Sequence, residues 1–168
     1  APPPPQAAPV AGGVRHVAWA RNANIYEVNL RQYTPEGTFK AFEAHLPRLR
    51  QMGVDILWLM PVQPIGVQER KGTLGSYYSV RDYVAVNPEF GTLADMDRLI
   101  AEAGRRGIRI VMDLVVNHTS DEHPWFNEAR DARDSARRSW YVWSKKRPKH
   151  WDKGMVFRQL PIRMTLSN

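Results

Sequence analysis

Three polar residues, Asp113, Asn117 and His118, lie at the end of an apolar run that begins at Gly107. The run is rich in β-branched residues and shows no strict alternation of apolar and polar positions. This pattern predicts a parallel strand that is covered on both faces. Ligands bind at the carboxyl ends of parallel strands, so a binding or catalytic site is expected at these three side chains. The alternative is that they only anchor the following loop.

Two other strand-like runs precede this one, at residues 24–30 and 54–60. Between them, Thr38 can cap a helix that ends at Gly53. Pro47 conflicts with an unbroken helix, because an interior proline loses a backbone hydrogen bond, and a kink is expected there. The apolar residues of this helix recur at spacings of three and four: Phe39, Phe42, Leu46 and Leu49.

A long loop and a second helix separate the second and third expected strands. Residues 62–91 are rich in Gly, Tyr and Pro, and loops of this length inside a domain are usually functional or mobile. Thr92 and Asp95 fit a capping box at the start of the helix. Its expected buried face consists of Leu93, Met96, Leu99, Ile100 and Ala103.

The order of elements is therefore strand, helix, strand, helix, strand, which predicts an α/β fold with a parallel sheet and right-handed crossovers. Two architectures fit, an open doubly wound sheet and the opening part of an eight-stranded barrel. A nucleotide-binding doubly wound fold requires a glycine-rich turn after the first strand, but residues 30–33 contain no glycine. After His118, a charged helix is expected from about Ser120 to about Arg138.

Composition limits the class of protein. A hydrophobic content of 43% fits a globular domain, and no window approaches the roughly 18 apolar residues of a membrane helix. The chain has no cysteine, which excludes disulfides and thiolate sites. Residues 1–14 are proline-rich and are expected to form an extended leader, consistent with export and a secreted or periplasmic location. The net charge of +7 is concentrated in residues 130–168, with eleven Lys or Arg against three Asp.

These motifs resemble the α-amylase family of glycoside hydrolases. The pattern Asp113, Val115, Asn117, His118 at the end of a third strand is similar to the family's first signature. The similarity extends to the family's first two barrel strands and to the loop that lines its sugar site, at residues 25–28, 56–61, 75–83 and 86–92. The resemblance implies a partial TIM-type (β/α) barrel over residues 15–119. Residues 120–168 would start the domain that the family inserts after the third strand, ending in an atypical basic tail.

The resemblance also implies roles for individual residues. His118 would hydrogen-bond the sugar hydroxyls, Tyr78 would stack on the sugar ring, and Asp113 would orient the site from below. These roles suit a sugar, which offers hydroxyl edges and an apolar face. Asp82 lies in the same loop and is expected to contribute to substrate binding. Asn117 would help to bind a structural calcium ion, for which an amide oxygen is a suitable ligand.

The function implied is hydrolysis of α-glucans such as starch and maltooligosaccharides with retention of configuration. Retaining glycosidases use two carboxyl groups, a nucleophile and an acid, about 5–5.5 Å apart. The family's signatures for these groups do not occur in the sequence, so this chain alone is expected to be inactive by that mechanism. One alternative is a non-catalytic carbohydrate-binding protein that uses Tyr77, Tyr78 and His118. A less favoured one is nucleic-acid binding through the basic, aromatic end.

Three strands cannot close a barrel of eight. The first and third expected strands would each leave an unpaired edge, and apolar side chains of the barrel interior would stay incompletely covered. We therefore expect the isolated chain to self-associate, aggregate or be partly molten. The residues expected to be incompletely buried are Ile56, Leu57, Leu59, Ile110, Val111 and Val115.

Overall fold

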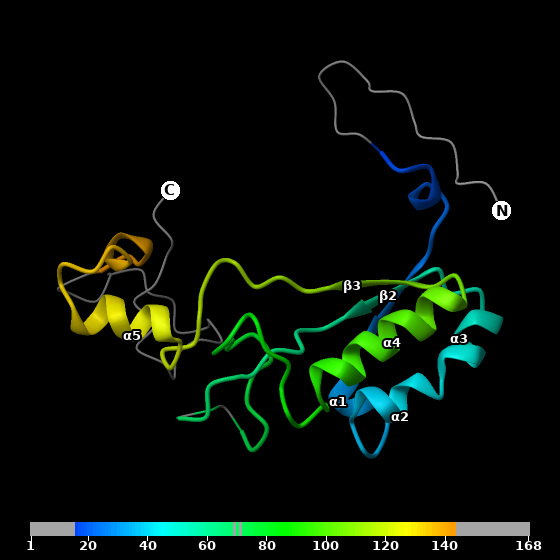
Figure 1. The fold of residues 1–168 in the computed structure, drawn as a ribbon, viewed down its shortest axis with the longest axis horizontal. Helices are drawn as coiled ribbons and strands as arrows, with labels where there is room; N and C mark the ends of the chain where they lie inside the picture. The colour runs from blue at the N-terminus through cyan, green and yellow to red at the C-terminus, as the bar shows by residue number, and fades with distance from the viewer. Residues whose placement is uncertain (1–15, 69, 71, 144–168) are drawn as a thin grey trace.

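The computed structural model of the chain describes residues 16–68, 70 and 72–143, so the proline-rich leader and most of the basic tail lie outside the described residues. A sheet of three parallel strands in the order β1-β2-β3 forms its centre (Figure 1). The strand carboxyl ends lie at one edge, as the βαβ order predicted. The strands are β1 (Ile25–Val28), β2 (Ile56–Leu59) and β3 (Arg109–Met112).

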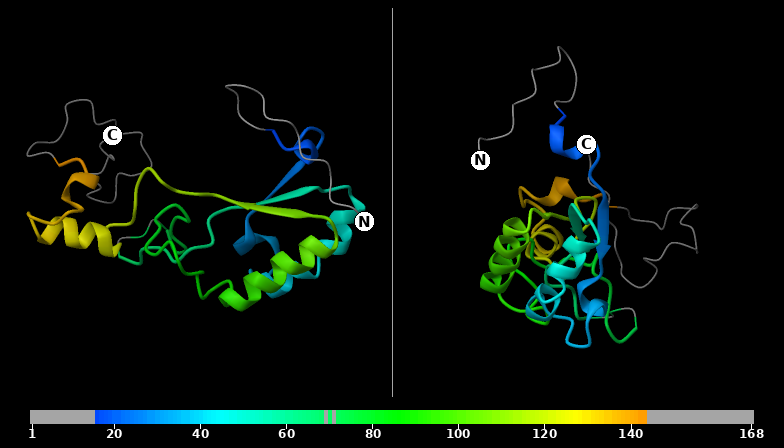
Figure 2. Two further views of the ribbon diagram at one scale, coloured as in Figure 1. Left: turned by 45° about the horizontal axis from the view of Figure 1, so that its top comes forward. Right: turned by 90° about the vertical axis from the view of Figure 1, so that its right-hand side faces the viewer.

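Four helices lie on one side of this sheet, and a fifth lies beyond its carboxyl edge (Figures 1 and 2). A short 3-10 helix, η1, precedes β1, and another, η2, follows the fifth helix. No helix in the described part of the chain is long and apolar enough to span a membrane. The helices are α1 (Leu30–Tyr33), α2 (Phe39–Glu43), α3 (Leu46–Gln51), α4 (Leu93–Arg105) and α5 (Pro124–Asp131), with η1 at Ala18–Ala20 and η2 at Arg138–Trp140.

The first predicted helix is divided into α2 and α3 at the position where the kink was expected. Pro47 lies in the first turn of α3, where the missing N–H has no intrahelical partner to lose. Thr38 caps α2 as predicted, because its Oγ1 accepts a hydrogen bond from the Ala41 N–H at 3.2 Å. The short helix α1 is not predicted by the sequence, which places Leu30 at the end of the first strand and assigns no element to residues 31–33.

The capping box of α4 is confirmed. Thr92 Oγ1 accepts from the Asp95 N–H at 3.2 Å, and Asp95 Oδ2 accepts from the Thr92 N–H at 2.9 Å. The predicted buried face is correct for Met96, Leu99 and Ala103. It is wrong for Leu93 and Ile100, which are 56% and 44% exposed. Ile100 faces the side of α4 next to β3, where the described residues provide no further element to cover it.

The sheet is covered mainly on the helix side, although Ile56 on the opposite face is also buried. Val28, Leu57 and Leu59 point towards the helices and are fully buried. The prediction that β3 is covered on both faces is wrong, because Val111 and Met112 are each 41% exposed. β3 is an edge strand of the described sheet, so one flank and the face opposite the helices have no partner. The predicted incomplete burial is confirmed for Val111 and Ile110 and wrong for the other four residues.

The segment after His118 forms a small aromatic unit around α5. Its members are Trp125, Phe126, Trp140, Tyr141 and Trp143. The predicted charged helix to Arg138 is wrong beyond Asp131, where the chain turns back. The guanidinium of Arg138 donates to the carbonyl of Ala129 at 2.7 Å, which brings the following aromatic residues against the helix. Phe126 and Trp143 are stacked with ring centroids 5.8 Å apart. Burial of aromatic surface therefore overrides the helix propensity of the charged residues.

Candidate functional site

The carboxylate of Asp113, immediately after β3, accepts hydrogen bonds from two neighbouring segments. The indole Nε1 of Trp58 in β2 donates at 3.2 Å, and the hydroxyl of Tyr78 in the long loop donates at 3.0 Å. Burial raises the pKa of Tyr78, and the bond to the Asp113 carboxylate raises it further. The phenol therefore stays protonated at neutral pH and acts as a donor.

His118 is tied to the same loop residue. Its Nε2 lies 2.9 Å from the carbonyl oxygen of Tyr78. A carbonyl only accepts, so Nε2 carries the proton in this contact. Tyr78 thus contacts Asp113 through its hydroxyl and His118 through its backbone. The structure brings together these three of the residues predicted from the sequence.

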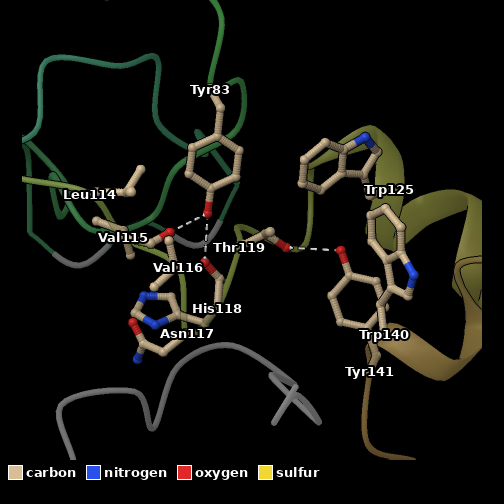
Figure 3. Close-up of a pocket in the computed structure, with 10 residues that line it drawn as sticks. All are labelled: Tyr83, Leu114, Val115, Val116, Asn117, His118, Thr119, Trp125, Trp140 and Tyr141. Atoms are coloured by element: carbon tan, nitrogen blue, oxygen red, sulfur yellow. Dashed lines mark hydrogen bonds between the residues drawn. The ribbon is translucent and has the colours of Figure 1, made fainter. Parts of the chain in front are cut away.

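Tyr83 fixes the backbone between Asp113 and the aromatic unit. Its hydroxyl lies 2.5 Å from the carbonyl oxygen of Val115 and 2.9 Å from that of His118, as Figure 3 shows. Burial raises the pKa of Tyr83, which keeps this hydroxyl protonated as a donor. The segment that carries His118 is therefore held from two sides, by Tyr83 and by the Tyr78 carbonyl.

Asp82 makes its interactions elsewhere. Its Oδ1 accepts from the Val84 N–H at 2.9 Å and closes a turn in the loop. It also lies near the buried His123, whose pKa is lowered by burial and partly restored by the Asp82 charge. Asp82 thus faces the aromatic unit and has no described hydrogen bond to Tyr78 or Asp113.

A pocket of about 280 Å³ lies between residues 114–119, which follow β3, and the aromatic unit (Figure 3). Asn117 and His118 line it on one side, and Trp125 and Trp140 line it on the other. The Tyr83 and Trp125 rings are stacked with centroids 5.7 Å apart. A second pocket of about 400 Å³, lined partly by Asp113, lies along the open flank of β3.

Asn117 is exposed, and its side chain has no carboxylate cluster beside it in the described chain. Within residues 16–68, 70 and 72–143, no group of three His, Cys, Asp or Glu side chains is placed to hold a metal ion. Asn117 alone supplies too few oxygens, since calcium takes six to eight. The described residues alone therefore do not make up a calcium site.

Sequence reasoning missed Trp58 and Tyr83 as parts of the site. A signal for Trp58 exists in the strand period, because Leu57 and Leu59 face the helices and the residue between them must face the opposite side. That side holds Asp113. Tyr83 had no comparable signal, since its contacts are to backbone carbonyls about thirty residues away in the sequence.

Comparison with known proteins agrees with this arrangement. The family model described as "Alpha amylase, catalytic domain" matches residues 18–159. The chain belongs to the alpha-amylase family. Among curated relatives, it is 41% identical over 135 residues to a probable alpha-glucosidase of Rhizobium meliloti, covering 77% of this chain and 23% of the relative. It is 37% identical over 143 residues to an oligo-1,6-glucosidase of Parageobacillus thermoglucosidasius, covering 80% and 24%.

Solved structures show the same fold. An alpha-amylase from Lactobacillus plantarum has a TM-score of 0.68 at 38% identity, covering 78% of this chain and 30% of that one. The trehalose-6-phosphate hydrolase of Bacillus licheniformis has a TM-score of 0.66 at 32% identity, covering 77% and 23%. The chain therefore forms a partial TIM-type barrel with an unclosed three-stranded sheet. It spans about a quarter of the length of the curated relatives it matches.

Proposed function

We propose that this chain provides one wall of the sugar-binding pocket of an enzyme that hydrolyses α-glucosidic bonds with retention. The observation that carries the proposal is the hydrogen-bonded group of Tyr78, Asp113 and His118 at the carboxyl edge of the sheet. A phenol ring, a carboxylate and an imidazole held together offer an apolar plate and polar groups to one sugar ring. The names of the relatives, alpha-glucosidase and oligo-1,6-glucosidase, support an α-glucosidic substrate.

The length and the linkage of the sugar are the next points to define. The sequence suggested starch and maltooligosaccharides, whereas three of the relatives are oligo-1,6-glucosidases. We propose a short α-glucoside as the ligand, either α-1,4 or α-1,6 linked. Maltose and isomaltose differ only in that linkage and are suitable probes.

We propose further that this chain alone binds such a sugar without hydrolysing it, since the signatures of the family's nucleophile and acid do not occur in it. Positioning groups alone supply no covalent step. A non-catalytic sugar-binding protein would behave in the same way in isolation. A fusion of this chain to the remaining barrel units of a relative would distinguish the two. Hydrolysis of maltose or isomaltose by that fusion would favour the enzyme.

The test combines calorimetric titration with a turnover assay on maltose and isomaltose. We expect saturable binding and no glucose release, and loss of binding in Tyr78→Ala and His118→Ala. Val84→Ala is the matched control, because Val84 is 89% exposed in the loop next to the site. Turnover by the purified chain would contradict its inactivity, and absence of binding to both sugars would contradict the sugar site.

We propose tests for two further ligands, a calcium ion and nucleic acid. A calcium site at Asn117 would require ligands beyond the described residues. It predicts a rise in thermal midpoint on addition of calcium chloride that Asn117→Ala abolishes. Nucleic-acid binding would depend on a basic tail that lies mainly outside the described part, and a salt-dependent shift with single-stranded DNA would support it.

A further inference from the structure

The side chain of Arg31, in α1 just beyond the carboxyl end of β1, is only 11% exposed. Its guanidinium carbon lies 4.2 Å above the centre of the Tyr77 ring. One terminal nitrogen, Nη1, donates to the carbonyl of Gly75 at 3.4 Å, and the other lies 3.9 Å from a carboxylate oxygen of Glu89. One side chain therefore contacts both the middle and the end of the loop at residues 62–91.

Tyr77 is held from β1 in a second way. Its hydroxyl donates to Oδ1 of Asn29 at 2.6 Å, while its ring lies against the guanidinium of Arg31. Asn29 and Arg31 are two residues apart, so one short segment fixes both the polar end and the face of the ring. The residue after Tyr77 is Tyr78, which contacts both Asp113 and His118.

The hydrogen bonding of the buried Arg31 side chain is incomplete. Its Nε and Nη2 are buried and have no hydrogen-bond partner among the described residues. Buried donors without partners cost free energy, and replacing buried charged groups by apolar ones of similar volume is often neutral or stabilising. The contacts that Arg31 does make, to the Tyr77 ring, the Gly75 carbonyl and Glu89, are all with the loop at residues 62–91.

We propose that Arg31 is a positioning residue of the sugar site, which holds the loop so that Tyr78 meets Asp113 and His118. The chain of contacts runs from the Arg31 guanidinium through Tyr77 to the backbone of Tyr78. Arg31 is buried beneath the loop and acts on the sugar through Tyr78. This inference rests on the proposed function for its meaning, but its geometry can be tested without a sugar.

The experiment compares Arg31→Met, Arg31→Lys and wild type by thermal unfolding and by the ¹H–¹⁵N resonance of the Trp58 indole, which donates to Asp113. Methionine keeps the length of the side chain and removes the charge. We expect the thermal midpoint of Arg31→Met to equal or exceed that of wild type, while the indole resonance shifts and isomaltose affinity falls by about tenfold. Arg31→Lys should restore part of both effects, because it can still bind the Gly75 carbonyl.

Arg98→Met is the matched control, since it removes an arginine that pairs with Glu43 and Asp95 on the surface of α4. It should leave the Trp58 resonance unchanged. An unchanged resonance in Arg31→Met would overturn the inference, as would a lower midpoint with no rescue by lysine, which indicates a purely structural role. If wild type binds no sugar but Arg31→Met still shifts the resonance, the proposed function fails and the positioning by Arg31 stands.

Discussion

Tyr78 is the residue that joins the separate segments of the site. Its ring is partly buried, its hydroxyl donates a hydrogen bond to the Asp113 carboxylate, and its backbone carbonyl accepts one from the imidazole of His118. The sequence identified these three residues through a family resemblance. It could not show that Tyr78 contacts both of the others, because the contacts span 35 and 40 residues and depend on how the loop folds.

The first prediction concerns the ionisation of Tyr78. The pKa of its phenol is raised above 10.0 mainly by burial and then by Asp113. In Asp113→Asn, the negative charge is removed while most of the burial remains, so the pKa should fall part of the way towards its ordinary value. Titration of the Tyr78 ring carbon by NMR measures this. Asp82→Asn is the control, and an equal fall there would contradict the assignment to Asp113.

At the scale of elements, local sequence signals predicted the strands, the cap of α2 and the capping box of α4. They failed where distant packing decides the outcome. Leu93 and Ile100 have the correct helical period but stay exposed, because no element in the described part of the chain covers them. The charged segment after Asp131 turns back to cover Phe126. Periodicity shows which residues share a face. It does not show whether another element covers that face.

The second prediction concerns the capping box of α4. Thr92→Ala removes the acceptor for the Asp95 N–H and should lower the free energy of unfolding by about 1 kcal/mol. Thr92→Ser keeps a hydroxyl acceptor and is the matched control. Urea denaturation followed by circular dichroism measures both. Equal stabilities of the alanine and serine variants would show that the box does not stabilise this helix.

The third prediction concerns the start of α5. Nδ1 of His123 accepts from the Trp125 N–H at 3.1 Å, and burial lowers the pKa of His123 below 6.5, with Asp82 acting in the opposite direction. Because the folded-state pKa is depressed, the unfolded chain binds the proton more readily. The contribution of neutral His123 to stability is therefore fully present above pH 6.5 and lost as pH falls through the folded-state pKa.

His123→Asn provides the corresponding measurement. Asparagine offers a side-chain oxygen to the same N–H but does not titrate in this range. The free energy of unfolding of this variant should depend less on pH than that of wild type as the pH falls below 6.5. Parallel pH profiles for the two proteins would contradict a titrating cap at His123.

At the scale of the whole molecule, part of the surface of the described sheet is uncovered. The curated relatives are about four times longer than the matched part of this chain and have enough residues to cover such a surface. β1 and β3 each lack a neighbour on one side, and the face opposite the helices carries exposed apolar side chains. Ile25 is 60% exposed and Val111 is 41% exposed. Unpaired strand edges with apolar side chains are sites of association between chains. The buried core between the sheet and the helices shows that the three strands and their helices pack together without a closed barrel.

The last prediction is that the isolated chain self-associates through the β3 edge and the open face. At about 25 cal/mol per Å², exposure of on the order of a few hundred Å² of apolar surface costs several kcal/mol. That is comparable to the roughly 5–15 kcal/mol net stability of a domain, so covering this surface by a second copy is strongly favoured.

Sedimentation velocity should show oligomers for wild type and a shift towards monomer for Val111→Lys, whose charge opposes burial of the open face. Val84→Lys places the same charge at an 89% exposed residue away from the sheet and should leave the oligomers intact. A monodisperse wild-type monomer with a sharp thermal transition would mean that residues outside the described part cover the sheet within one chain.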